Sequence, residues 1–206
     1  MGFQLRQPKH QNSSMKIITK RSFVVALALL GVFALGNFSS EAKPKMTEDQ
    51  LIAELSGSNP DKVADAMLQL ERNFPTSTKF LPKVKELLTD PREKVRRKAG
   101  RVLGALHSEV SETDLKNIAA MLKASEPHEV IDALKSLRGL EAKSTIPEIM
   151  PLLKHSTVNV VRDALRTLAT LGNKSNVADV EPLLKHSDPK VQKDAMDAIH
   201  TLKSKS

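Results

Sequence analysis

The feature that most constrains this chain is an alanine that returns every 31 residues, at Ala133, Ala164 and Ala195. A leucine or isoleucine follows four positions after each alanine, and a leucine follows seven positions after it. Apolar residues at positions 0, +4 and +7 share one face of an α-helix, so the spacing predicts a helix around each alanine. These apolar residues are Leu137, Leu168 and Ile199 at +4 and Leu140, Leu171 and Leu202 at +7.

A second apolar pair precedes each of these helices at the same interval, as in Leu152-Leu153 and Leu183-Leu184, so each unit contains two helices. Degraded copies around Ala99 and Ala66 bring the total to about five units. A two-helix unit cannot bury its apolar face alone, so neighbouring units must stack into an open-ended core. The sequence therefore predicts an all-α, right-handed α-solenoid of about five two-helix repeats over residues 47–203.

Short polar and proline-containing segments separate the two helices of a unit. A polar residue can cap a helix and proline suits its first position, so these segments are expected to begin the second helices. Other prolines fall early in the first helices, and a proline beyond the first turn is expected to kink its helix. The segments are Asn59-Pro60, Asp90-Pro91, Glu126-Pro127 and Asp188-Pro189, and the other prolines are Pro82, Pro147, Pro151 and Pro182.

Two stretches of the repeat carry a family resemblance. Ile146-Pro-Glu-Ile-Met-Pro-Leu-Leu153 with Val160-Val-Arg-Asp-Ala-Leu165, and Asp90-Pro-Arg-Glu-Lys-Val-Arg-Arg-Lys-Ala99, resemble HEAT-like repeats of the bilin-lyase type, which are armadillo-like. The resemblance covers residues 47–203 and implies the solenoid fold. Such proteins include interaction scaffolds, bilin lyases and a few enzymes, and a shared fold does not confer a function.

The N-terminal region has the pattern of an export signal. Residues 15–42 contain a basic start, an apolar run from Phe23 to Gly36, and small residues near Ala42 for cleavage. The run is shorter than the roughly 20 residues of a membrane-spanning helix, so no stable span is expected after cleavage. We expect a cleaved signal and a periplasmic or extracellular product, and the alternative is an uncleaved anchor. Residues 1–14 precede a complete signal, which suggests that Met15 is the true start.

Composition narrows the classes of partner. The chain has no cysteine, which excludes disulfides and thiolate chemistry, and no tryptophan or tyrosine on which bases could stack. Cleavage after Ala42 removes five of 32 basic residues and one of 24 acidic residues, which lowers the formal net charge from +8 to about +4. Nucleic acid is therefore not the expected partner.

Candidate catalytic and metal-binding groups are few. His155 and His186 occupy equivalent positions after Leu-Leu-Lys, and a helix end explains them better than a metal because no third ligand recurs with them. His128-Glu129 resembles one His-Glu pair of the HEAT-like deoxyhypusine hydroxylases, which need several pairs for their di-iron site. No phosphate-binding loop or nucleophile elbow occurs. We therefore expect no catalytic residue, cofactor or metal.

The strongest candidate for a binding surface is a row of basic residues. Positions −2 and +2 from the repeated alanine point away from the apolar face, and six of the eight such positions in the last four units are basic. The resemblance implies that second helices line the concave side, where partners bind. The alternative is an ordinary solvated face. The candidate residues are Arg97, Arg101, Lys135, Arg162, Arg166 and Lys193.

An acidic column accompanies the basic row. The residue before the repeated alanine is aspartate in four units and Lys98 in one. This position faces an adjacent unit, so we expect the aspartates to pair with basic residues of the neighbouring second helix, and Lys98 to pair with Asp132. The four aspartates are Asp65, Asp132, Asp163 and Asp194.

These observations predict a non-enzymatic, exported scaffold that binds a protein partner through an acidic or extended segment. Two alternatives remain open: a bilin-lyase-like or other cofactor-handling enzyme, and a binder of an anionic polymer or envelope component. Guanidinium groups can bind either a carboxylate-rich or a phosphorylated ligand.

Overall fold

The computed structural model describes residues 45–205, so the predictions for residues 1–14 and for the signal at 15–42 lie outside the described part. Apart from Lys45, the described residues belong to the second of two compact units, which begins at Met46. Within them every regular element is a helix, and no such helix is both long and apolar enough to span a bilayer.

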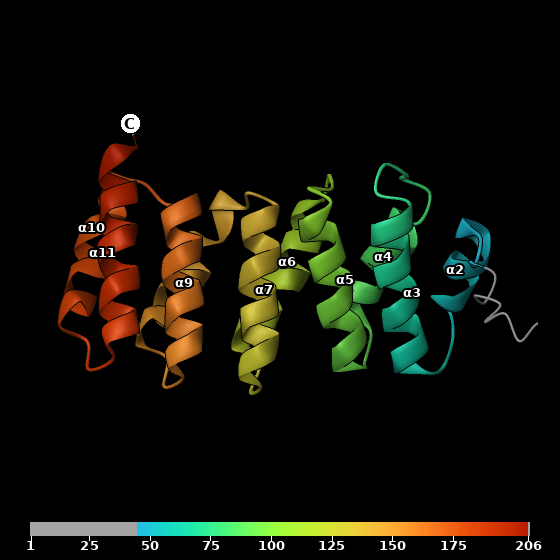
Figure 1. The fold of residues 1–206 in the computed structure, drawn as a ribbon, viewed down its shortest axis with the longest axis horizontal. Helices are drawn as coiled ribbons and strands as arrows, with labels where there is room; N and C mark the ends of the chain where they lie inside the picture. The colour runs from blue at the N-terminus through green and yellow to red at the C-terminus, as the bar shows by residue number, and fades with distance from the viewer. Residues whose placement is uncertain (1–44, 206) are drawn as a thin grey trace, which may run out of the picture. The chain divides into compact units, whose positions relative to one another are not determined.

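The helices alternate between two rows, as the repeat predicts (Figure 1). The first helices are α2 (Glu48–Glu54), α4 (Leu81–Glu86), α6 (Glu112–Ala120), α8 (Ile146–Ile149) and α10 (Val177–Val180). The second helices are α3 (Pro60–Asn73), α5 (Glu93–Ala105), α7 (Pro127–Gly139), α9 (Val158–Leu171) and α11 (Pro189–Ser204).

Short 3₁₀ segments complete the last four first helices. They are η1 (Leu87–Thr89), η2 (Met121–Lys123), η3 (Lys143–Thr145) with η4 (Met150–Lys154), and η5 (Lys174–Asn176) with η6 (Glu181–Lys185). Pro151 and Pro182 lie in the first turns of η4 and η6, directly after α8 and α10. Proline removes a backbone donor and obstructs the preceding turn, so the α-helix gives way to a 3₁₀ segment there instead of continuing through the expected kink.

The second helices stand side by side in chain order, each packed against the next, while the first helices lie behind them (Figure 1). The predicted solenoid of five stacked two-helix units is therefore confirmed. Its core follows the 31-residue pattern, because Ala99, Ala133, Ala164 and Ala195 are all fully buried or nearly so, and Leu168 is inaccessible to solvent.

The predicted caps are correct at two of the four turns. Asn59 accepts hydrogen bonds from the backbone of Asp61 and Lys62, and Asp188 accepts one from Lys190. Glu126 makes no side-chain cap. The Asp90-Pro91 prediction is wrong in register, because α5 begins later, after an Arg92 that holds the N-cap position.

Helices α5 and α7 approach unusually closely at their C-terminal ends. A Cβ added to Gly139 would lie 2.3 Å from the carbonyl oxygen of Gly104, and one added to Gly104 would lie 2.8 Å from the backbone of Ser136. Only glycine permits this backbone contact. Both helices then end in Schellman turns, in which His107 and Glu141 adopt positive φ values of 46° and 52°.

Candidate functional site

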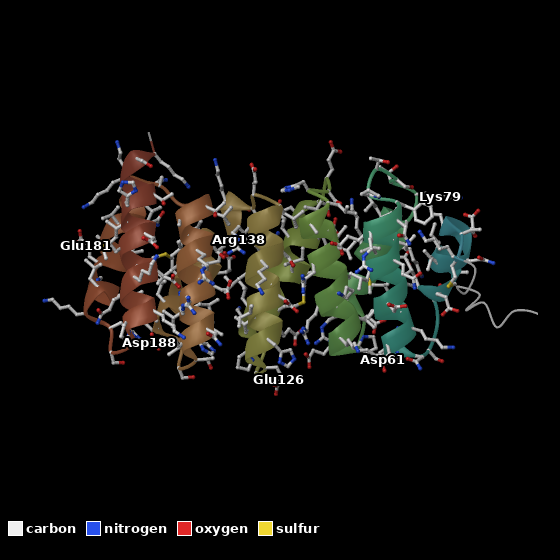
Figure 2. All side chains as sticks on the ribbon, in the orientation of Figure 1. Asp61, Lys79, Glu126, Arg138, Glu181 and Asp188 are labelled. Atoms are coloured by element: carbon white, nitrogen blue, oxygen red, sulfur yellow. The ribbon has the colours of Figure 1, made fainter. Side chains whose placement is uncertain are left out.

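The six basic residues predicted as a row all lie on second helices: Arg97 and Arg101 on α5, Lys135 on α7, Arg162 and Arg166 on α9, and Lys193 on α11. Figure 2 shows the polar side chains that cover this side of the solenoid. The six residues differ in how fully neighbouring carboxylates neutralise them.

The C-terminal half of the row is neutralised. Arg162 donates from Nε to Asp194 at 2.7 Å, and Arg166 lies 3.2 Å from the same carboxylate. Lys193 pairs with Asp197 on its own helix at 2.7 Å. Each cation in this half therefore already has a carboxylate partner.

The acidic column bridges neighbouring units at Asp132, Asp163 and Asp194, as predicted, whereas the exposed Asp65 accepts a hydrogen bond from Gln69 on its own helix. Asp132 on α7 accepts from Arg97 on α5 at 2.9 Å, and Asp194 on α11 accepts from Arg162 on α9. Arg138 on α7 lies 3.9 Å from Asp163 on α9. Because these carboxylates are largely buried, the pairs fix the register of one second helix on the next.

Lys98 does not take the predicted place in the column, because Asp132 is held by Arg97 and approached by Arg101 at 3.9 Å. Burial lowers the pKa of the Lys98 ammonium group, and the positive charge of Arg101 lowers that pKa further.

Three basic residues that have no short ion pair to a carboxylate lie close together on α5 and α7. Arg101 is half exposed and only loosely paired, and exposed Lys135 has no carboxylate within ion-pair distance among residues 45–205. Arg138, labelled in Figure 2, has only the long contact to Asp163. We call Arg101, Lys135 and Arg138 the central basic cluster.

The central basic cluster surrounds a hollow of about 460 Å³. The close approach of Gly104, Ser136 and Gly139 forms its floor, while His107, Glu141 and Thr170 complete the lining. Two of these residues occupy the positive-φ position of the Schellman turns. The turns and the helix contact thus form a concave site in which three cations face a single carboxylate, that of Glu141.

The central basic cluster shows what the sequence pattern missed. Arg138 lies five residues after the repeated Ala133, whereas the predicted row contains only residues two positions before or after each alanine. The signal that could have found it was the neighbouring glycine pair, since Gly104 and Gly139 remove side chains from the helix surface beside it. The row predicted from sequence is thus divided into a free central part and a neutralised C-terminal part.

His155 and His186 have a local structural role. The ring Nδ1 of His155 accepts the backbone N–H of Thr157 at 3.0 Å, and that of His186 accepts the backbone N–H of Asp188 at 3.0 Å. Each imidazole closes the turn between the two helices of its unit. Among the described residues, no three histidine or acidic side chains gather as a metal site would require.

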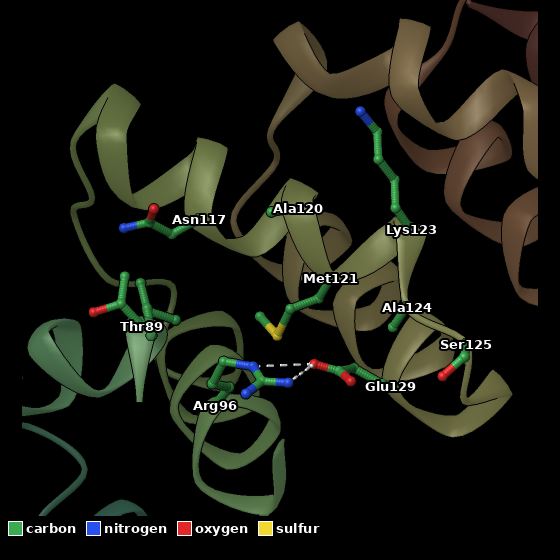
Figure 3. Close-up of a pocket in the computed structure, with 10 residues that line it drawn as sticks. Thr89, Arg96, Asn117, Ala120, Met121, Lys123, Ala124, Ser125 and Glu129 are labelled. Atoms are coloured by element: carbon green, nitrogen blue, oxygen red, sulfur yellow. Dashed lines mark hydrogen bonds and ion pairs between the residues drawn. The ribbon is translucent and has the colours of Figure 1, made fainter. Parts of the chain in front are cut away.

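His128 and Glu129 diverge rather than forming a joint site. His128 contacts Glu93 at 2.7 Å, whereas the buried carboxylate of Glu129 accepts two hydrogen bonds from Arg96, the shorter at 2.9 Å. Figure 3 shows this ion pair at the edge of a pocket beside Met121 and Asn117. Because the guanidinium group occupies the carboxylate, the pair links α5 to α7 and Glu129 is not a free carboxylate.

Comparison with known proteins supports the fold. No family model matches the chain. The complex of CpcE and CpcF of phycocyanin lyase from Nostoc aligns with a TM-score of 0.67 and 21% identity, over 82% of this chain and 70% of that one. The fold is an armadillo-like, HEAT-like α-solenoid. At this identity the similarity shows the fold alone.

Two further similarities concern a designed protein and a natural one. A designed armadillo repeat protein in complex with the peptide (KR)4 aligns with a TM-score of 0.57 and 16% identity, over 75% of this chain and 81% of that one. Zygote-specific protein 3 of Chlamydomonas reinhardtii is 40% identical over 85 residues, 40% of this chain. The match spans only about a fifth of that relative.

Proposed function

We propose that this protein is a non-enzymatic scaffold that holds an acidic, extended segment of a partner protein across its second helices. The helical-repeat fold supports a binding scaffold in general, because stacked units present one long side-chain surface. The finer proposal depends on the central basic cluster. An acidic side chain of the segment would enter the hollow between α5 and α7, and neighbouring residues would run along the row.

The charge balance along the second-helix side carries this proposal. Arg162, Arg166 and Lys193 have carboxylate partners, so a ligand there must displace an existing ion pair. Lys135 has no such partner within the described part, and Arg101 and Arg138 have only long contacts. Charge-assisted hydrogen bonds to a carboxylate would therefore be gained at the cluster without breaking short ones.

A protein segment fits this charge distribution better than a uniform anionic polymer. A polymer gains affinity from every phosphate or sulfate that meets a free cation, so it favours a long continuous row. Among the six residues of the predicted row, those without a short ion pair, Arg101 and Lys135, lie on α5 and α7. The designed armadillo protein bound to (KR)4 illustrates a repeat surface holding a charged peptide. The surface proposed here would instead hold an acidic peptide, because its central cluster is basic.

The basic start and short apolar run of residues 15–42 support export, and we propose a periplasmic or extracellular partner on that basis. Affinity capture from the extracytoplasmic fraction would seek this partner. The binding chemistry itself can be tested first with defined probes.

Fluorescence anisotropy with a labelled peptide of alternating glutamate and serine tests the proposal. The test variant is Arg101→Ser with Lys135→Ser, which removes two free cations of the cluster. The matched control is Arg166→Ser with Lys193→Ser, which removes the same two positive charges from the neutralised half of the row. We expect the test variant to lose about tenfold or more in affinity and the control to lose much less.

Three results would contradict the proposal. One is equal loss of affinity in both variants, which would mean that net charge alone attracts the peptide. The second is tighter binding of (KR)4 than of the acidic peptide. The third is binding of heparin or duplex DNA far more tightly than of the acidic peptide, with a steep salt dependence, which would favour the anionic-polymer alternative.

A second candidate function follows from the similarity to the phycocyanin lyase complex. An apolar groove of about 520 Å³ lies among the first helices, lined in part by Met150, Leu153 and Leu183. Such a groove could hold a flat apolar cofactor such as a bilin. Titration of the protein with a free bilin would show an absorbance shift that Leu183→Glu abolishes, and no shift would exclude this candidate.

A further inference from the structure

Two large apolar side chains are exposed among the described residues, and both lie in the last unit. Leu184 on η6 is 42% exposed and Met196 on α11 is 60% exposed. Their counterparts in earlier units are buried. Leu88, Leu122 and Leu153 correspond to Leu184 and are 2% to 6% exposed. Met67, Leu134 and Leu165 correspond to Met196 and are inaccessible to solvent.

The following unit covers these positions wherever one is present. The backbone oxygen of Leu134 lies 3.5 Å from the hydroxyl of Thr167 on the next second helix. Leu153 lines a groove together with Pro182 and Leu183 of the next unit. Leu184 and Met196 therefore belong to the surface with which a unit meets its successor. In the last described unit, where α11 stands at the end of the row of second helices (Figure 1), these two side chains of η6 and α11 are exposed.

The charges around Met196 fit a second copy of the same surface. Lys193 and Asp197 are exposed, lie four residues apart on α11, and pair with each other at 2.7 Å. If two α11 helices run antiparallel about a twofold axis level with Ala195, Lys193 of one copy comes opposite Asp197 of the other. A contact about a twofold axis must be self-complementary, and one cation and one anion on either side of the axis satisfy that condition.

We propose that two copies of this chain associate through their C-terminal ends, with α11 packed antiparallel on α11 and Met196 and Leu184 at the centre. The contact buries apolar surface that repeat proteins ordinarily cover with a polar cap. It exchanges two intrahelical ion pairs for two intermolecular ones. The contact uses α11 at the end of the row, and the central basic cluster on α5 and α7 stays accessible, so this association is independent of peptide binding at the hollow between α5 and α7.

A cysteine scan of the full chain tests the geometry, because the natural sequence contains no cysteine. Met196→Cys lies beside the proposed axis, and oxidation should convert most of the protein into a disulfide-linked dimer. Lys116→Cys, on the exposed side of α6, is the matched control and should stay uncross-linked. Equal cross-linking of the two variants, or none at Met196→Cys, would overturn the proposal.

A charge exchange tests the pairing without cysteine. Sedimentation velocity of the full chain should show a dimer that Lys193→Asp and Asp197→Lys each weaken about tenfold or more, and that the double exchange restores. Thermal unfolding checks that each variant folds. Three results would contradict the proposal. They are a monomer at all concentrations, a series of growing oligomers that indicates head-to-tail stacking, and a dimer whose affinity neither charge exchange changes.

Discussion

Substitution of Gly139 by alanine probes the spacing between α5 and α7 on which the central basic cluster depends. The new methyl group would lie 2.3 Å from the carbonyl oxygen of Gly104 and 2.8 Å from its carbonyl carbon. Carbon atoms in contact prefer about 3.5–4.0 Å, so the helices must separate locally by about 1 Å. Both clashing atoms belong to the backbone, so no side-chain rotation can relieve the overlap.

The expected cost is that of an overpacked core, about 1–3 kcal/mol in the free energy of unfolding. The higher helix propensity of alanine offsets at most about 1 kcal/mol, and less at the last residue of a helix. Gly100→Ala is the matched control, because its Cβ would meet mainly the side-chain atoms of Ser136 and Met121 at 3.2 and 3.3 Å. That variant should stay within about 0.5 kcal/mol of the original protein.

Urea unfolding followed by circular dichroism at the helix band measures both variants. We expect a lower midpoint for Gly139→Ala with an unchanged slope, since the surface exposed on unfolding is the same. The variant should also bind the acidic peptide less tightly, because the cations around the hollow move apart. A Gly139→Ala protein as stable as the original, or more stable, would refute the close contact between α5 and α7.

Three other predictions concern the core, acid stability and the acidic column. Leu168→Ala should lower the unfolding free energy by about 2–5 kcal/mol, since the side chain is inaccessible to solvent. An unchanged free energy in urea unfolding would contradict the assignment of Leu168 to the buried face of the repeat. Hydrogen bonding to Arg92 lowers the pKa of the Asp90 carboxyl group below its usual value. The stabilisation that this hydrogen bond provides is present above the unfolded pKa near 3.9 and is lost as the pH falls through the lower pKa of the folded state. The urea midpoint of the original protein should therefore fall between about pH 5 and pH 3. For Asp90→Asn the midpoint should fall less over the same range. Asp132→Asn should tighten acidic-peptide binding about two- to fivefold, because it frees Arg97 and Arg101. In the same anisotropy titrations, Asp194→Asn should change the peptide affinity less. A larger effect of Asp194→Asn would contradict the assigned site.

The alternation of helices could be predicted from the sequence because the 31-residue period repeats the same burial at each alanine. Local helix boundaries were harder to predict. The α5 start was misplaced because Asp90 does not cap the helix directly. It instead holds Arg92 at 2.7 Å, and Arg92 also donates to the backbone oxygens of Gly57 and Ser58 in the preceding unit. A tertiary contact thus determined where the helix begins.

The candidate site shows the same division between local and tertiary information. The helical wheel placed Arg101 and Arg166 at equivalent positions, and nothing in the sequence near them distinguishes the two. Their surroundings differ because Asp194 lies 3.2 Å from Arg166, whereas Asp132 is engaged by Arg97 and lies 3.9 Å from Arg101. Which cations stay free depends on contacts between units, and these contacts follow only from the packed helices.

Site-specific photo-cross-linking tests the central claim most directly, since it reports where an acidic segment lies on the folded protein. A photoreactive amino acid would replace Lys135 beside the hollow or, as control, Lys116 on the exposed side of α6. Irradiation with the labelled acidic peptide should attach the label at position 135 and leave position 116 unmodified. Attachment at position 116 alone, or at both positions equally, would contradict a binding site between α5 and α7.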